Sequence, residues 1–126
     1  MLVVDSGGLS RLSERTPGAA ALIRALRREG LWPPTVPTIV LTESTSGRAR
    51  TDANINWLLK TCDVDARVPE VTARRAGQLR ARARRGSAID ALVVALAEPG
   101  STVLTADRHD LAALAAHAEH VDIEVI

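Results

Sequence analysis

Four acidic side chains stand where helices and strands are expected to begin or end. Asp5 follows the apolar run LVV, Asp107 follows the run TVLT, and Glu43 and Asp90 fall on stretches expected to be helical. The carboxyl ends of parallel strands share one edge of a sheet, so a parallel fold can bring these acids together. Converging carboxylates repel one another unless cations lie between them. The pattern therefore predicts a site for Mg²⁺ or Mn²⁺, ions that bind oxygen ligands and chiefly serve phosphate chemistry.

Three of these acids also have a purely structural interpretation as helix caps. Asp5 could cap the helix that follows it. Asp90 stands three residues after Ser87, and SAID has the spacing of a capping box. Asp107 could cap the last helix, with Asp110 in the reciprocal role or stabilised by the positive end of the helix dipole. Both interpretations stay open for each acid taken alone.

Glu43 lies beside the apolar residues Val40 and Leu41. A carboxylate that faces a core must be neutralised or coordinated, which favours a functional role for Glu43. A rotated helix would instead leave it in water.

Zinc is a less suitable ion for this sequence. The three histidines, His109, His117 and His120, do not accompany the acids in a recognised ligand spacing, and a single cysteine excludes a thiolate cage. We expect His117 and His120 to be exposed on the final helix, and Cys62 to be a small core residue.

A cationic block occupies the stretch between Glu70 and Asp90, which contains no acid. Its arginines are Arg74, Arg75, Arg80, Arg82, Arg84 and Arg85. Guanidinium groups form forked hydrogen bonds to phosphate, so the block predicts an RNA-binding surface. The alternative is a solvated helix face whose arginines pair with neighbouring acids. With Trp32 and Trp57 as the only aromatic residues, stacking of single-stranded bases is poorly supported.

The composition is that of one globular domain spanning residues 1–126. Apolar residues make up 46% and charged residues 25% of the chain, and no apolar run is long enough to span a membrane. The start MLVVD lacks the features of a signal peptide, so we expect a cytoplasmic protein without membrane contact.

Apolar runs and amphipathic stretches alternate along the chain, which indicates an α/β fold. We expect strands at 2–5, around 35–36, and at 64–68, 102–105 and 123–126. Helices are expected after the turn at 6–12 and at 17–30, 38–47, 51–62, 69–85, 87–97 and 110–120. Strands separated by helices pair in parallel with right-handed crossovers. The sequence therefore predicts a three-layer α/β/α sandwich with a central, mostly parallel sheet.

Four segments, LVVDSGGLS, VPTIVLTES, SAIDALVVALA and VLTADRHDL, together resemble the PIN domain and in particular its VapC-type toxin ribonucleases. The resemblance covers the chain in order. It implies a Mg²⁺- or Mn²⁺-dependent endoribonuclease of a toxin–antitoxin module, with Asp5, Glu43, Asp90 and Asp107 in its acidic site. It also implies a small cognate VapB-type antitoxin and a homodimer.

Ser6 and Thr105 match hydroxyl positions of the pattern, whereas Gly7 replaces a frequent small hydroxyl residue and Val94 a frequent alanine. The expected reaction is hydrolysis of an RNA phosphodiester by a metal-activated water. Asp5 and Asp90 would be the principal metal ligands.

In the same expectation, Glu43 is a ligand or orients the attacking water, and Asp107 binds a second ion or supports the first. Thr105 orients a carboxylate or a water. A non-catalytic PIN-like module that binds nucleic acid or protein is the alternative.

Overall fold

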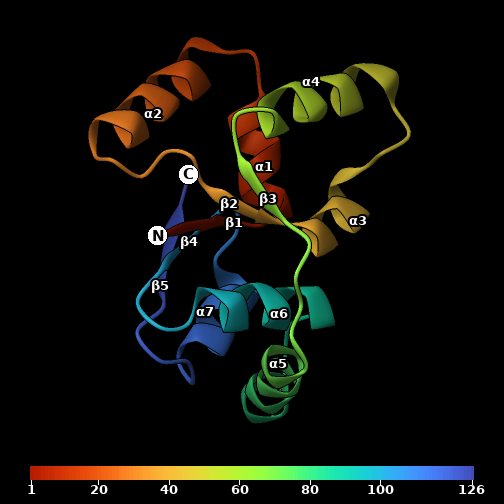
Figure 1. The fold of residues 1–126 in the computed structure, drawn as a ribbon, viewed down its shortest axis with the longest axis vertical. Coiled ribbons are helices and arrows are strands. Elements are labelled where there is room, and N and C mark those ends of the chain that lie inside the picture. Colours follow the sequence, from red (N-terminus) through yellow and green to blue (C-terminus); the bar gives the residue numbers. More distant parts are fainter.

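A single five-stranded parallel sheet forms the centre of the computed structural model, which describes residues 1–126 (Figure 1). The strands are β1 (Leu2–Val4), β2 (Thr35–Pro37), β3 (Asp63–Asp65), β4 (Thr102–Thr105) and β5 (Asp122–Val125). Their order across the sheet is β3-β2-β1-β4-β5, and every neighbouring pair is parallel. The predicted fold class is therefore confirmed.

Helices cover both faces of this sheet and complete three layers (Figure 1). One layer holds α1 (Ser6–Ser13), α2 (Pro17–Arg28) and α4 (Ala49–Leu59), and the other holds α5 (Glu70–Ala83), α6 (Ala88–Ala97) and α7 (His109–Ala115). A 3₁₀ turn, η1 (Thr38–Val40), and the one-turn helix α3 (Leu41–Ser44) follow β2; η1 contacts α6, and α3 packs on α1. None of the helices combines the length and the apolar character needed to cross a bilayer.

The core lies where β1 and α6 meet. All three residues of β1 are buried, and α6 contacts β1, β4, α5 and α7. A helix enclosed by neighbours must be apolar almost all round, which explains the sequence AIDALVVALA. Asp90 in its first turn is the exception.

Gly8 brings the start of α1 directly onto the end of β4. A Cβ atom at this position would collide with the backbone carbonyl oxygen of Leu104. Only glycine permits this approach, which also places Asp5 beside the last residue of β4, Thr105.

The helices expected at 38–47 and at 110–120 are both shorter in the structure than the sequence predicts. The helix expected at 38–47 is divided into η1 and α3 and ends at Ser44, because Thr45 is extended. The helix expected at 110–120 spans His109–Ala115, and His120 adopts a left-handed conformation that turns the chain into β5. His117 and His120 are exposed as expected, but they do not lie on a helix.

Candidate functional site

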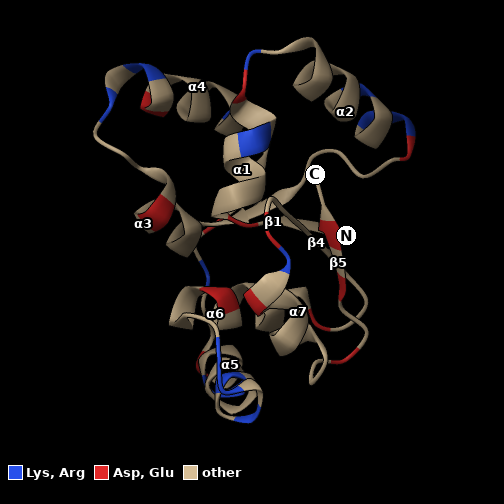
Figure 2. Cartoon of the chain, turned by 180° about the vertical axis from the view of Figure 1, so that it is seen from behind, with Lys and Arg blue, Asp and Glu red and all other residues tan.

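A pocket of about 210 Å³ opens at the carboxyl ends of β1 and β4. It is lined by Asp5, Ser6, Gly7, Asp90, Thr105, Ala106, Asp107, Asp110 and Leu111. Figure 2 shows acidic positions on the ends of α6 and α7 that face the sheet. The expected convergence of Asp5, Asp90 and Asp107 at one edge of the sheet is thus present, together with Ser6 and Thr105.

Asp5 is the most buried acid of the pocket, with 8% of its surface exposed. Its Oδ1 accepts a hydrogen bond from the Gly8 amide at 2.7 Å, and its Oδ2 accepts one from the Thr105 hydroxyl at 2.7 Å. Burial raises the pKa of this carboxyl, the bonds from Gly8 and Thr105 oppose the rise, and the negative charge of Asp90 adds to it. Asp5 is thus a helix cap and also a buried acid close to a second acid.

Asp90 forms the capping box expected from SAID. Its Oδ2 accepts the Ser87 amide at 3.0 Å, while the Ser87 hydroxyl accepts the Asp90 amide at 3.0 Å. The second oxygen of the Asp90 carboxylate makes no hydrogen bond within the protein, and Asp90 is one of the residues that line the pocket. The structural interpretation is therefore confirmed, and one oxygen stays free for a ligand.

Thr105 connects Asp5 to Asp107. Its hydroxyl donates to Asp5, accepts the amide of Asp107 at 3.2 Å and lies 3.1 Å from the Asp107 carbonyl oxygen. Asp107 itself is exposed, and its Oδ1 accepts the amide of His109 at 3.0 Å. The expectation that Thr105 orients a carboxylate agrees with this geometry.

The capping box that was the alternative interpretation of Asp107 and Asp110 does not form. The Asp107 amide is bound by Thr105 instead, and Asp110 pairs with Arg85 across 3.0 Å. Asp110 lies in the first turn of α7, as expected, but it also lines the pocket. Its spacing of three residues from Asp107 was the only sequence signal for this position.

Glu43 is not among the residues that line the pocket. The buried positions of its segment are Val40 and Ser44, four residues apart on one face, so Glu43 lies on an exposed face of α3. The expectation that Glu43 faces the core is therefore wrong, and the alternative of a rotated helix is correct. In Figure 2 its helix lies at the side of the sheet, level with the strands.

The arginine block divides into two groups along α5. At the amino-terminal end, Arg74 pairs with Glu70 at 3.0 Å, and Arg75 pairs with Glu98 at 2.9 Å, next to the carboxyl end of α6. At the other end, Arg80 binds the carbonyl oxygen of Gly86.

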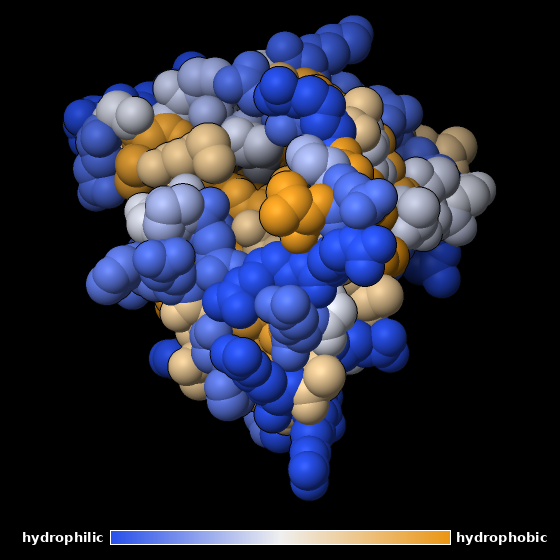
Figure 3. Space-filling model, turned by 60° about the horizontal axis from the view of Figure 1, so that its bottom comes forward, coloured by the Kyte–Doolittle hydropathy of each residue, from blue (hydrophilic) through white to orange (hydrophobic).

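Near the carboxyl-terminal end of α5, Arg85 contacts Asp110 and the ring of His109. Arg82 and Arg84, at the same end, make no hydrogen bonds or ion pairs through their side chains. Figure 3 shows hydrophilic side chains over much of the underside of the molecule, where α5 lies.

The donor atoms of the pocket suit a hydrated Mg²⁺ or Mn²⁺ ion. No three histidine, cysteine, aspartate or glutamate side chains lie close enough to form a metal cage made of protein alone. Magnesium commonly keeps several waters and binds through one or two carboxylates, which Asp5 and the free oxygen of Asp90 can supply. The all-oxygen lining and the exposed position of His109 do not suit zinc.

No model of a known protein family matches the chain, and no curated protein sequence matches it.

Proposed function

We propose that the protein is a Mg²⁺- or Mn²⁺-dependent endoribonuclease that hydrolyses RNA phosphodiester bonds. The observation that carries this proposal is the position of Asp5, a buried carboxylate whose raised pKa reflects burial and the nearby charge of Asp90. Such an arrangement is unfavourable for the ionised acids alone and becomes favourable when a cation neutralises them. The resemblance of four segments to the PIN domain supports RNA as the substrate.

In this proposal, Asp5 and Asp90 hold the ion, directly or through its waters, and Asp107 contributes its second oxygen. When bound there, the ion would supply a water of lowered pKa and would neutralise charge on the phosphate oxygens. The Thr105 hydroxyl fixes the rotation of the Asp5 carboxylate through its 2.7 Å bond. Ser6, whose hydroxyl makes no hydrogen bond within the protein, is available to a phosphate oxygen.

Arginines near the pocket would bind the phosphates that flank the cleaved bond. Arg82 and Arg84 have no acidic partner, and Arg80 binds only a carbonyl oxygen. Arg74 and Arg75 are engaged with Glu70 and Glu98 at the far end of α5, which gives them a smaller part in binding RNA. Glu43, outside the pocket, is not required for metal binding in this proposal.

We further propose that the enzyme is a cytoplasmic toxin neutralised by a cognate VapB-type antitoxin, and that it forms a homodimer. A basic side chain from the antitoxin would compete with the metal ion for the carboxylates of Asp5 and Asp90. This part of the proposal rests on the resemblance to VapC-type toxins.

A binding module without catalysis is the second candidate, and a specific observation favours it. Asp5 and Asp90 both cap helices, so a structural need alone would account for each of them. The two functions differ in whether RNA is cut.

The experiment compares cleavage of single-stranded RNA, DNA of the same sequence and a generic phosphate ester, with Mn²⁺ or with EDTA. We expect RNA fragments only in the presence of the metal, and none from Asp5→Asn or Asp90→Asn. Asp122→Asn serves as the control, because Asp122 is exposed at the opposite end of the sheet. Intact RNA under every condition would favour the binding module, and equal cleavage by both pocket variants would refute the assigned roles.

A further inference from the structure

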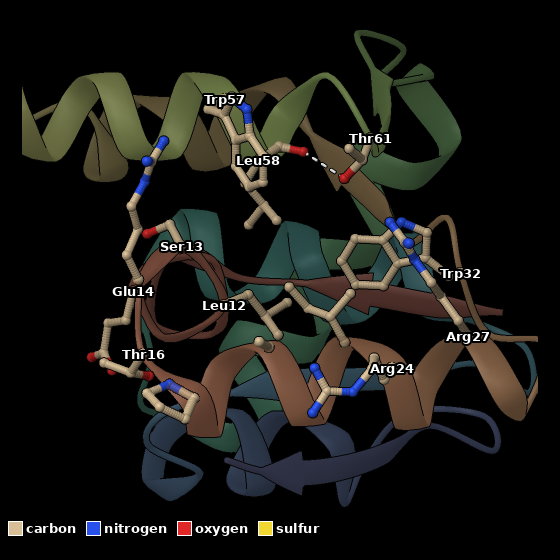
Figure 4. Close-up of a pocket in the computed structure, with 14 residues that line it drawn as sticks. Leu12, Ser13, Glu14, Thr16, Arg24, Arg27, Trp32, Trp57, Leu58 and Thr61 are labelled. Atoms are coloured by element: carbon tan, nitrogen blue, oxygen red, sulfur yellow. Dashed lines mark hydrogen bonds between the residues drawn. The ribbon is translucent and has the colours of Figure 1, made fainter.

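A second and larger cavity, of about 520 Å³, lies between α1, α2 and α4 (Figure 4). The only two aromatic side chains of the chain, Trp32 and Trp57, both line it, although they lie far apart in the sequence and on different elements. Leu12 and Leu58 contribute apolar surface between them (Figure 4). The cavity shares no lining residue with the acidic pocket.

The polar groups of this cavity are predominantly cationic. Arg15, Arg24 and Arg27 line it, and none of the three forms an ion pair within the protein. The one acid of the lining, Glu14, is paired with Arg11. An anionic ligand is therefore favoured at the rim of the cavity.

Both indole rings are associated with a guanidinium group. The Arg15 guanidinium lies 5.2 Å from the centre of the Trp57 ring, and that of Arg27 lies 5.5 Å from the centre of the Trp32 ring. Cation–π contacts of this kind hold an arginine beside an aromatic surface, where it can also bind an anion. Trp57 remains 57% exposed, so much of its surface is open to a ligand.

Trp32 lines the cavity and carries an unpaired polar atom. Its indole Nε1–H is buried and has no hydrogen-bond acceptor, the only such side-chain atom in the protein. A buried donor without a partner is costly, and most are satisfied in folded proteins. The nitrogen itself has almost no accessible surface, so the cavity presents the ring of Trp32 to a ligand, not its N–H group.

We propose that this cavity binds a nucleotide, that is, a planar base carrying phosphate, supplied either as a free mononucleotide or as one residue of an RNA strand. The base stacks on Trp57, and the phosphate binds Arg24 and Arg27. The volume is adequate for a ligand of this size. This inference does not rest on the proposed nuclease activity.

Tryptophan fluorescence reports directly on the cavity, because the chain contains no tyrosine and both tryptophans line the cavity. Full-length protein in EDTA is titrated with each ribonucleoside monophosphate, with inorganic phosphate and with a short single-stranded RNA, correcting for nucleotide absorption. We expect a saturable change with at least one monophosphate and a much weaker effect of phosphate alone. Tighter binding of the RNA, in competition with the mononucleotide, would identify RNA as the source.

The variants test the two halves of the ligand separately. Trp57→Leu removes the stacking surface at an exposed position and should weaken binding about tenfold, measured by calorimetry. Arg24→Gln combined with Arg27→Gln should weaken binding to a similar extent, whereas Arg28→Gln, a neighbouring exposed arginine outside the cavity, should leave it unchanged. Asp5→Asn should also bind normally, which separates this test from the nuclease assay.

Several results would overturn the proposal. These are the absence of a saturable change with every nucleotide, an equal response to inorganic phosphate, and binding that none of the cavity variants weakens. A response only to an acidic helical peptide, with none to nucleotides, would assign the cavity to a protein partner instead.

Discussion

Replacing Asp5 with asparagine should make the protein more stable at neutral pH while removing its metal site. Asparagine can keep both hydrogen bonds of Asp5, because its Oδ1 accepts the Gly8 amide and its amide group donates to the Thr105 hydroxyl oxygen. The Thr105 hydroxyl then donates to the Asp107 carbonyl oxygen, which already lies 3.1 Å away. The substitution therefore removes a buried charge near Asp90 without leaving a polar group unpaired.

The raised pKa of Asp5 fixes the sign of this effect. The burial of Asp5 and its proximity to Asp90 outweigh its hydrogen bonds, so the ionised carboxyl is less favourable in the folded chain than in the unfolded one. We expect Asp5→Asn to add about 1 kcal/mol to the free energy of unfolding, or roughly 3–5 °C in Tm for a chain of this size. Asp5→Ala loses both hydrogen bonds and should be about 2 kcal/mol less stable than Asp5→Asn.

The pH dependence follows from the same shift. Below the ordinary aspartate pKa of 3.8, Asp5 is protonated in both states and carries no penalty. Wild-type stability is lost relative to Asp5→Asn as the pH rises through the raised pKa of the folded state.

The assay is urea unfolding in EDTA at pH 3.5 and pH 7 for the wild type and both variants. The reasoning would be refuted if Asp5→Asn were clearly less stable than the wild type at pH 7. It would also be refuted if the variant exceeded the wild type in free energy of unfolding by the same amount at both pH values.

Three further experiments test the packing and the arginine groups. Gly8→Ala should lower the free energy of unfolding by about 2 kcal/mol or more, measured by thermal unfolding, because its Cβ would collide with β4. Gly77→Ala, on the open face of α5, should raise the free energy of unfolding by up to ~1 kcal/mol. Equal effects of the two substitutions would contradict the close approach of α1 to β4. Arg75→Gln should lower the free energy of unfolding in urea by about 1–3 kcal/mol and leave RNA affinity nearly unchanged. This loss of stability should become smaller at acidic pH, because the Glu98 carboxylate that pairs with Arg75 becomes protonated once the pH falls below its lowered pKa. Arg82→Gln combined with Arg84→Gln should weaken RNA binding and lower its salt dependence by about 1.4 in the slope of log K against log salt; an unchanged slope would contradict their role.

The order of strands and helices was predictable from the sequence because the apolar runs are short and separated by amphipathic segments. Parallel pairing then required Asp5 and Asp107 to meet at one edge, and the capping spacing of Ser87 and Asp90 placed Asp90 in the first turn of α6.

Side-chain direction within one short turn was not predictable. Glu43 follows apolar residues, but the buried face of its segment runs through Val40 and Ser44, and a rotation of one residue on so short a helix exposes it. The partners of the arginines depend on how α5 packs against α6 and α7, so the pairing of Arg75 with Glu98 has no local signal. The meeting of Trp32 and Trp57 likewise depends on the packing of α4 beside α1 in the same helical layer.

Direct binding of Mn²⁺ to the acidic pocket, measured by electron paramagnetic resonance on purified protein, tests the central claim before any substrate is known. The account predicts that the wild type binds the ion, that Asp5→Asn and Asp90→Asn weaken binding at least tenfold, and that Asp122→Asn binds as the wild type does. Failure of the wild type to bind Mn²⁺, or unchanged binding by both pocket variants, would contradict the proposed metal site.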